Sequence, residues 1–493
     1  MCIPAHILLQ ATGITCNSRD VKPGYIFVAI HGRATNGNLF IQDALSRGAI
    51  AVVTDEGGTC QLALPIFQVD NARQALAQLA AEYYGHPSRE LQLIGVTGTN
   101  GKTTITAMLE HIFCHYGLTA GLIGTVQVNL GKASLPSTLT TPDAATLQYY
   151  LRQMCQNNVT HAAMEVSAQG IDMHRADHVN FSCGILANIS PDHLDFHGDY
   201  AAYIAAKKNF LNLLTPTTPL IVNRDDCCCR DIASHYTGPV FSVSLSSSNA
   251  DLRANMLTTT AYGSRTLMTV QNDLLLAGSS LSAKTFELRL SVAGRHNVEN
   301  ALLAIAAARL AEIPLNNICT ALAEFKSVDR RMTIFHLEGR TIIDDTALNP
   351  GSIAAVFDTI SHLRYRRLIV ANAIRGNRGQ AINAVNAATL ASQQRQLPFH
   401  LIVTTAADYV SHPDKVSADE EAAFIQALDD ADAAYAFTET LPDALKLAFD
   451  SSLPGDLLVL LGAQGMDEGR RLLTQLIPKS WANPALSSVR PLL

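Results

Sequence analysis

The sequence predicts an α/β protein of three domains. Apolar, strand-like runs alternate with amphipathic, helix-like stretches along most of the chain, which is typical of parallel sheets with crossover helices. The 493 residues correspond to about three domains at roughly 150 residues each. Hydrophobic residues make up 48% of the chain and charged residues only 16%, so extended disorder is excluded.

Charge and cysteine content narrow the class of protein. The chain has 36 Lys and Arg against 43 Asp and Glu, and a net charge of −7 disfavours a nucleic-acid partner held by phosphate neutralisation. No apolar run is long enough to span a membrane, and residues 1–10 lack the cationic segment of a signal peptide. The ten cysteines, including the consecutive Cys227 to Cys229, form no disulfide framework or zinc pattern. We therefore expect a cytoplasmic protein with reduced thiols, no membrane insertion and a monomeric state.

Residues 1–90 predict a small α/β domain. Short β-like runs lie at 26–30 and 49–54, and an amphipathic stretch lies at 40–47. Turn signals occur at Pro23-Gly24 and Gly57-Gly58.

Residues 91–332 predict a larger central domain with a parallel sheet. It opens with a strand at 93–96, a glycine turn, and a helix at 103–116 that Gly117 closes. Alternation over 250–292 predicts antiparallel strands appended to the sheet, before an Ala-rich helix at 298–310. Further buried strands are expected at 161–166, 183–189 and 220–223.

Residues 333–493 predict a doubly wound, Rossmann-like domain. Strand-like and helix-like segments alternate through it. The strands are expected at 341–344, 368–371, 400–404 and 457–461, and the helices at 353–360, 382–394, 420–428 and 444–449.

The central domain carries a candidate phosphate loop, Gly95-Val-Thr-Gly-Thr-Asn-Gly-Lys-Thr-Thr104, between a strand and a helix. Lys102 could reach the β and γ phosphates of a nucleotide and Thr103 could hold Mg²⁺, although the spacing differs by one residue from the standard pattern. The alternative is a glycine-rich turn without chemical function. The loop residues expected to surround the phosphates are Gly98, Thr99, Asn100, Gly101, Lys102, Thr103 and Thr104.

Two further segments offer metal ligands. Glu165 ends a buried strand at the sheet edge where parallel sheets bind ligands, and a carboxylate there suits a hard cation. The loop after the next strand places His193 among the carboxylates of Asp192 and Asp195, which makes it a second candidate ligand. The alternatives are a solvated strand end for Glu165 and a capping cluster for the two aspartates.

These residues resemble the Mur ligases, and among them the MurE type, which adds the third amino acid to UDP-N-acetylmuramoyl-L-alanyl-D-glutamate. N-terminal segments such as Asn17-Ser18-Arg19 and Val21-Lys-Pro-Gly24 extend the resemblance over the whole chain. The segments of the central domain that carry it are Thr97-Gly-Thr-Asn-Gly-Lys-Thr-Thr104, Thr140-Thr-Pro-Asp143, Met164-Glu-Val-Ser167, Asp192-His-Leu-Asp-Phe-His-Gly198, Tyr203-Ile-Ala-Ala-Lys207 and Gly294-Arg-His-Asn-Val-Glu-Asn300.

The resemblance implies amide synthesis that depends on ATP and Mg²⁺. A substrate carboxylate would attack the γ-phosphate, and the amine of a free amino acid would then displace phosphate from the acyl-phosphate. Glu165 and His193 would hold metal ions, and Lys207 matches the family's carbamylated lysine, an anionic metal ligand. A solvated surface lysine is the alternative for Lys207, whose neighbour Lys208 lies on the same expected helix.

The resemblance also assigns binding residues. Asn297 would contact adenine, Arg331 phosphate and Asp345 ribose. Asn297 could instead cap the Ala-rich helix, Asp345 could simply end a strand, and the adjacent Arg330 could replace Arg331. The residues that match contacts to the UDP-sugar dipeptide are Ser18, Thr140, Thr141, Ser167 and Arg175.

Departures from the family pattern concentrate in the C-terminal domain, which in this family presents the incoming amino acid. The acidic and arginine positions of the family's DNPR segment are Ala406 and Tyr409, so no guanidinium is available there for a distal carboxylate. Leu348 replaces a histidine. Arg375 and Arg378 lie on a glycine-rich turn that could bind substrate or remain solvated.

Three functional hypotheses remain open from the sequence. The first is a MurE-type ligase of peptidoglycan precursor synthesis. The second is a related ligase diverted to another acceptor or amino acid, and the third is a nucleotide-binding regulator that forms no amide bond.

Overall fold

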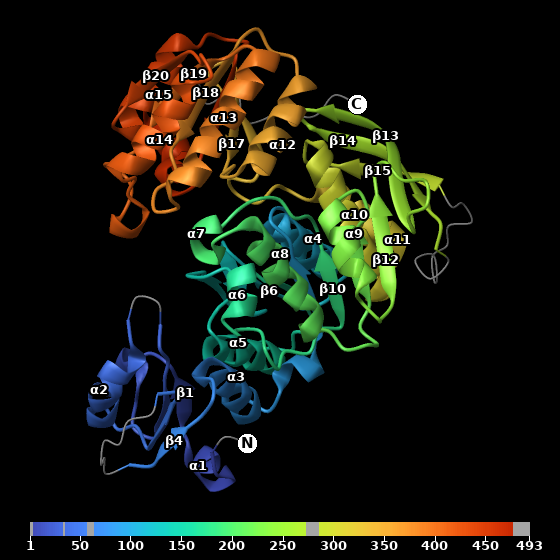
Figure 1. Cartoon of the computed structure of the whole chain (residues 1–493). Helices are drawn as coiled ribbons and strands as arrows, with labels where there is room; N and C mark the ends of the chain where they lie inside the picture. Colours follow the sequence, from blue (N-terminus) through green and yellow to red (C-terminus); the bar gives the residue numbers. More distant parts are fainter. Residues whose placement is uncertain (1–2, 33–34, 57–63, 273–284, 477–493) are drawn as a thin grey trace.

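The computed structural model describes residues 3–32, 35–56, 64–272 and 285–476. Sheets of four, eleven and six strands follow one another along the chain, and helices pack against each of them (Figure 1). The predicted three-domain α/β class is confirmed.

The N-terminal sheet is fully parallel, in the order β1-β2-β3-β4. The expected runs at 26–30 and 49–54 form β2 and β3, and α2 falls within the amphipathic stretch at 40–47. The Gly57-Gly58 turn lies outside the described residues. The elements are α1 (Ala5–Gln10), β1 (Gly13–Thr15), β2 (Tyr25–Ala29), α2 (Ile41–Ser46), β3 (Ala51–Thr54), β4 (Ile66–Gln68) and α3 (Ala72–Tyr83).

The central sheet has the order β15-β14-β13-β12-β11-β10-β5-β9-β6-β7-β8. Its middle strands, from β12 to β6, run parallel. They are β5 (Gln92–Thr97), β6 (Ala120–Ile123), β9 (His161–Glu165), β10 (Cys183–Leu186), β11 (Leu220–Asn223) and β12 (Val240–Ser244). Because β9, β5 and β10 are neighbours, the loops after them meet at one edge of the sheet.

Antiparallel strands extend both ends of this sheet. The predicted appendage is formed by β13 (Leu252–Thr260), β14 (Gly263–Val270) and β15 (Thr285–Leu290), which are antiparallel to one another, although β13 runs parallel to its neighbour β12. The hairpin of β7 (Gln127–Asn129) and β8 (Ser134–Pro136) at the other end was not expected, because its strands are too short to show a pattern.

The helices predicted at 103–116 and 298–310 are present in the central region. Gly117, with φ of +89°, ends α4 as predicted. Gly294 precedes α10, so the interpretation of Asn297 as the cap of that helix is wrong: Asn297 lies inside the first turn. The helices are α4 (Lys102–His115), α5 (Ala144–Gln156), α6 (Ala168–Asp172), α7 (Leu194–His197), α8 (Tyr200–Lys208), α9 (Cys227–Ser234), α10 (Arg295–Leu310) and α11 (Leu315–Glu324).

The C-terminal sheet has the order β16-β17-β21-β18-β19-β20, with only β16 antiparallel. The elements are β16 (Thr333–Leu337), β17 (Arg340–Asp345), α12 (Pro350–Ser361), β18 (Leu368–Ala373), α13 (Gln380–Gln396), β19 (His400–Thr404), α14 (Ala418–Asp429), β20 (Tyr435–Thr438), α15 (Leu441–Ser451), β21 (Leu457–Leu461) and α16 (Gly469–Gln475). The expected strands and helices of this region are all present.

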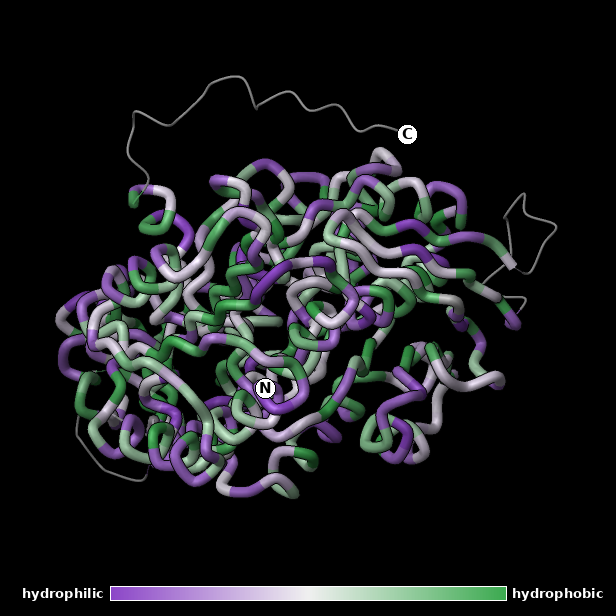
Figure 2. Tube along the Cα trace, turned by 90° about the horizontal axis from the view of Figure 1, so that it is seen from above, coloured by the Kyte–Doolittle hydropathy of each residue, from purple (hydrophilic) through white to green (hydrophobic). Residues whose placement is uncertain are grey.

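Hydrophobic and hydrophilic residues are interspersed along the trace when the molecule is seen from above (Figure 2). Within the described ranges, no helix combines the length and the apolar character that crossing a bilayer requires.

Candidate active site

A cavity of about 510 Å³ lies between two parts of the molecule. One is the edge of the central sheet that carries the loops after β5, β9 and β10, and the other is the end of β17, α12 and the loop after β18 in the C-terminal domain. The cavity brings together most of the residues singled out from the sequence. They are Thr99, Asn100, Gly101, Lys102, Thr103, Thr104, Thr140, Glu165, Ser167, His193, Asn297, Arg331 and Asp345.

The phosphate loop needs glycine at two positions. Gly98 (φ +149°) and Gly101 (φ +87°) both have positive φ values, which side chains disfavour. A Cβ on Gly101 would also collide with the side-chain oxygen of Asn300, on the second turn of α10. These constraints hold the backbone in one conformation at the start of α4, so that glycine is required at both positions.

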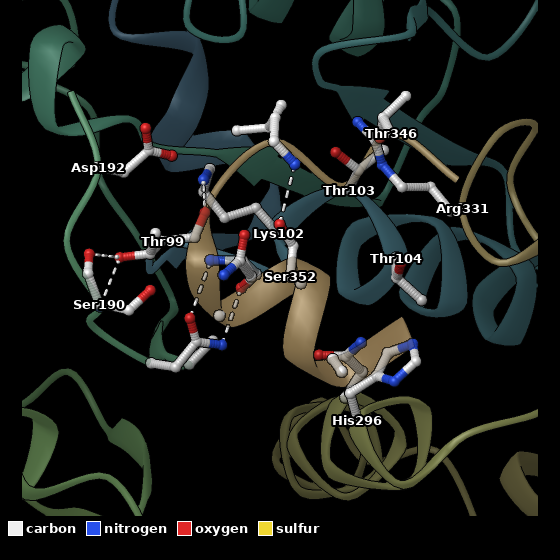
Figure 3. Close-up of a pocket in the computed structure, with 18 of the residues that line it drawn as sticks. Thr99, Lys102, Thr103, Thr104, Ser190, Asp192, His296, Arg331, Thr346 and Ser352 are labelled. Carbon is white, nitrogen blue, oxygen red and sulfur yellow. Dashed lines mark hydrogen bonds between the residues drawn. The ribbon is translucent and has the colours of Figure 1, made fainter. Parts of the chain in front are cut away.

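The neighbouring 188–190 segment braces this loop. The Thr99 amide donates to the Asn188 carbonyl (2.8 Å), and the Asn100 amide donates to Asn188 Oδ1 (2.9 Å). The Thr99 hydroxyl donates to the Ser190 carbonyl (3.1 Å) and accepts from the Ser190 amide (3.0 Å), as Figure 3 shows. The loop after β5 and the loop after β10 therefore form one rigid unit.

Lys102 faces the cavity from the start of α4. Its ammonium donates to the carbonyls of Gly98 and Thr99, both at 2.9 Å. Burial lowers the pKa of Lys102, while Glu165 and Asp192 act in the opposite direction. A phosphate group beside this ammonium would favour its charged form.

Glu165 ends β9 and is 1% exposed. Its carboxylate accepts from the Thr125 amide (2.7 Å) and from the Thr125 hydroxyl (3.0 Å). A Cβ added to Gly124 would lie 2.5 Å from Glu165 Oε1, so this carboxylate packs directly against backbone. Burial excludes the solvated alternative for Glu165 and leaves an oriented oxygen donor at the cavity wall.

His193 lines the cavity in a left-handed conformation (φ +52°), and its side chain is 46% exposed. Within the described ranges, no group of three or more His, Cys, Asp and Glu side chains is arranged to hold a metal ion. The oxygen donors Glu165 and Thr103 suit Mg²⁺, which takes few protein ligands and completes its shell with phosphate and water.

Lys207 lies behind the phosphate loop rather than in the cavity wall. It is 1% exposed, and its amine donates to the Gly98 carbonyl (2.9 Å) and the Thr97 hydroxyl (3.2 Å). The solvated alternative for Lys207 is therefore excluded. Burial, reinforced by the nearby Lys102 charge, holds the pKa of Lys207 well below its ordinary value, which favours a neutral, nucleophilic amine.

Asn297, Arg331 and Asp345 all line the cavity, Asn297 from α10 and the other two from the start of the C-terminal domain. Arg331 is the arginine that lines the cavity, because Arg330 points into the C-terminal domain and forms ion pairs with Asp344 and Asp467. Burial raises the pKa of Asp345 to about 6.

Two residues of α10 that the sequence analysis did not single out, His296 and Glu299, also line the cavity. Burial lowers the pKa of His296 to about 4 and raises that of Glu299 to about 7. Both lie within the Gly294–Asn300 segment, so their place in that motif was the available signal.

Contacts between the central and C-terminal domains form one wall of the cavity. The side-chain amides of Asn100 and Asn349 exchange two hydrogen bonds of 3.0 and 3.1 Å. The Arg375 guanidinium donates to Asp192 Oδ1 (3.1 Å), and the Asn349 amide donates to Asp192 Oδ2 (3.0 Å). Burial opposes ionisation of Asp192, but Arg375 and His193 outweigh it and hold the pKa of this carboxyl below its usual range.

The expected contacts to the UDP-sugar dipeptide are only partly gathered at the cavity. Thr140 and Ser167 line it, whereas Thr141 is buried behind Ser167 and donates to the Glu165 carbonyl (3.0 Å). Arg175 donates to the Thr141 carbonyl (2.9 Å) and does not line the cavity. Ser18 lies in the N-terminal domain, hydrogen bonded to Asp43.

Family models match three successive parts of the chain. They are the Mur ligase family catalytic domain over residues 10–84, the Mur ligase middle domain over 96–308 and the Mur ligase glutamate ligase domain over 330–464.

Relatives with similar sequences include UDP-N-acetylmuramoyl-L-alanyl-D-glutamate–2,6-diaminopimelate ligases from two bacteria. The protein from Halalkalibacterium halodurans is 34% identical over 354 residues, covering 71% of this chain and 70% of that protein. The protein from Caldanaerobacter subterraneus is 27% identical over 92% of this chain and 90% of its own length.

Solved structures show the same fold. A UDP-N-acetylmuramoyl-L-alanyl-D-glutamate–2,6-diaminopimelate ligase superposes with a TM-score of 0.64 at 22% identity, covering 94% of this chain and 95% of that one. MurF from Acinetobacter baumannii superposes with a TM-score of 0.70 at 20% identity, covering 96% and 98% of the two chains. With the phosphate loop, Glu165 and the C-terminal domain assembled around one cavity, and with these matches along its length, the chain belongs to the Mur ligase family.

Proposed function

We propose that this chain is an ADP-forming ligase that joins an amino acid to UDP-N-acetylmuramoyl-L-alanyl-D-glutamate during peptidoglycan precursor synthesis. The single observation that carries this proposal is the cavity itself. The phosphate loop and Glu165 lie on one side of it, and an arginine-bearing loop of the C-terminal domain lies on the other. A carboxylate is a poor electrophile, and phosphorylation by ATP gives it a leaving group that an amine can displace.

The phosphate side of the cavity supplies positive charge and fixed backbone donors. Lys102 would exchange its contacts with the Gly98 and Thr99 carbonyls for oxygens of the transferring phosphoryl group. Asn297, Arg331 and Asp345 would hold adenosine and phosphate at the other end of the nucleotide.

Glu165, Thr103 and His193 would hold Mg²⁺, which neutralises charge on the phosphates when bound. The neutral amine of buried Lys207 is suited to react with carbon dioxide. Carbamylation would give an anionic oxygen donor next to the loop, since a lysine in its ordinary form cannot ligate a cation.

We place the UDP-sugar dipeptide along Ser18, Thr140, Thr141, Ser167 and Arg175, between the N-terminal and central domains. The proposed domains are residues 1–90 for the UDP-sugar, 91–332 for ATP and 333–493 for the amino acid. We also propose that the protein is a monomer, because all of these residues lie on a single chain. Its proposed substrate is a UDP-linked precursor, which supports a cytoplasmic location for the protein.

The amino acid is the open part of the proposal. Neither position 406 nor position 409 carries a cationic side chain that could bind a distal carboxylate. Ala406 is fully buried, and Tyr409 is hydrogen bonded to Arg471. Arg378 lines the cavity, and among the described residues its buried Nε has no hydrogen-bond partner. The absence of an arginine at positions 406 and 409 favours, as a second candidate, a ligase diverted to an amino acid other than the diaminopimelate named for its relatives.

Phosphate release from ATP tests the proposal. We expect release that requires both UDP-N-acetylmuramoyl-L-alanyl-D-glutamate and an amino acid, screened over a panel with diaminopimelate, lysine and ornithine. Lys102→Ala should lower the rate by about 10³-fold, because it removes the charge next to the transferring phosphoryl group. ATP binding without release under every combination would instead indicate a regulator.

A further inference from the structure

The loop of residues 375–379 brings both Arg375 and Arg378 to the cavity. The two guanidinium groups are not equivalent. Arg375 is engaged, since it donates to Asp192 (3.1 Å) and to the Leu348 carbonyl (3.3 Å). Arg378 donates to the adjacent Asn377 carbonyl (2.9 Å) and, unlike Arg375, forms no ion pair with a carboxylate of the described residues. Arg378 is therefore the cation of this loop that is available to bind a substrate anion.

The backbone of this loop has an unusual shape that exposes its amides to one side. Asn377 has φ of +55° and Gly379 has φ of +88°, on either side of Arg378. Alternation of this kind turns successive N–H groups toward a common point and forms an anion-binding concavity. Such an arrangement needs an acceptor of negative charge, because buried N–H groups without partners are costly.

Glu420 fills this concavity from the first turn of α14. Its Oε1 accepts from the amides of Arg378 and Gly379, both at 2.7 Å, and its Oε2 accepts from the Asn377 amide at 3.1 Å. The Glu420 residue is only 4% exposed. Burial opposes its ionisation, but the backbone N–H groups outweigh burial and keep the pKa of Glu420 below its usual value.

Asn383 on α13 holds the same loop from its carbonyl side. Its amide donates to the Arg375 carbonyl (2.8 Å) and to the Gly379 carbonyl (3.2 Å). The loop is thus fixed at both ends by Asn383 and in its middle by Glu420, on two helices outside the cavity wall. Neither residue lines the cavity.

We propose that Glu420 is a positioning residue for the incoming amino acid: it fixes the 375–379 backbone so that Arg378 faces the acceptor. This inference rests on the proposed ligase function for its kinetic consequence, but not for its structural one. Glu420 does not touch the reacting atoms and acts only through the loop.

Glu420→Gln tests the proposal, because the amide keeps the shape of the side chain but places an NH₂ group against backbone donors. We expect the KM for the acceptor to rise at least tenfold, with kcat and the KM for ATP within threefold of wild type. The acceptor is whichever of meso-diaminopimelate, L-lysine and L-ornithine gives the highest kcat/KM with the wild-type enzyme.

Two matched variants separate this role from helix capping. Ser417→Ala removes the other half of the capping box of α14 but leaves the bonds from Glu420 to the loop. Asp419→Asn removes an equal charge from an exposed side chain on the same turn. Both should leave the KM for the acceptor within twofold. An unchanged KM in Glu420→Gln, or an equal rise in Ser417→Ala, overturns the proposal.

Hydrogen exchange of the amides of residues 377–379 is a readout that does not need activity. These amides should exchange at least tenfold faster in Glu420→Gln than in wild type, while those of α13 keep their protection. If the wild-type chain shows no acceptor-dependent phosphate release, the proposed function fails, and this exchange measurement still decides whether Glu420 holds the loop. Unchanged exchange of the amides of residues 377–379 would refute the positioning role of Glu420.

Discussion

The two sides of the cavity are built differently. On the central-domain side, backbone groups dominate: Gly98, Gly101 and the amides of Thr99 and Asn100 fix the phosphate loop. On the C-terminal side, side chains dominate. Arg375, Asn349 and Glu420 fix the loops there through an ion pair and hydrogen bonds. A phosphate site formed by backbone groups tolerates few substitutions. The specificity of an acceptor site held by side chains can change through single substitutions. This difference agrees with departures from the family pattern that lie mainly in the C-terminal domain.

The strongest test of the central side is Lys207→Ala. We expect phosphate release to fall by about 10²–10³-fold, because the variant removes the group that would become an anionic metal ligand next to the loop. The adjacent Lys208→Ala, made on the same helix, should stay within twofold of wild type. Turnover that survives both Lys207→Ala and depletion of carbon dioxide would show that this lysine holds no metal.

Arg375→Ala tests whether the two sides depend on each other. Removing one partner of a buried ion pair leaves Asp192 uncompensated, and the free energy of unfolding should fall by about 3 kcal/mol. Urea unfolding measures the loss. Combining Arg375→Ala with Asp192→Asn should recover part of it, because the second change removes the unpaired charge. Strictly additive losses would mean that the pair contributes nothing across the domains.

The smallest expected effect concerns pH and Glu299, at the nucleotide end of the cavity. Its pKa is raised to about 7, and that of Asp345 to about 6, so the folded chain retains protons that the unfolded chain releases above its ordinary carboxyl pKa values. The contribution of Glu299 to stability should therefore fall by about 1–2 kcal/mol as pH rises from 5 to 8, while His296, whose pKa is lowered to about 4, contributes in the opposite direction.

Thermal unfolding across this range checks the sign. Relative to wild type, Glu299→Gln should gain stability as pH rises from 5 to 8, and the exposed Glu324→Gln should follow the wild-type curve. A difference between wild type and Glu299→Gln that stays constant between pH 5 and 8 would contradict the prediction.

The sequence predicted one side of the site better than the other, for a physical reason. Lys102 and Glu165 were found because a strand, a turn and a helix adjacent in sequence must place them at the same sheet edge. Thr125 and Asn349 were missed because their partners Glu165 and Asn100 lie 40 and 249 residues away. Short apolar strands such as β20 were also missed, since a few residues carry too little periodicity to be distinguished from a loop.

Gly124 shows how far the requirements of this site extend beyond its motifs. Residue 124 belongs to none of the segments by which the family is recognised, yet any side chain there would displace the Glu165 carboxylate that packs against it. In a library of random single variants, substitutions at position 124 should therefore abolish turnover as often as substitutions of the phosphate-loop glycines, although residue 124 is not expected to contact ATP or substrate.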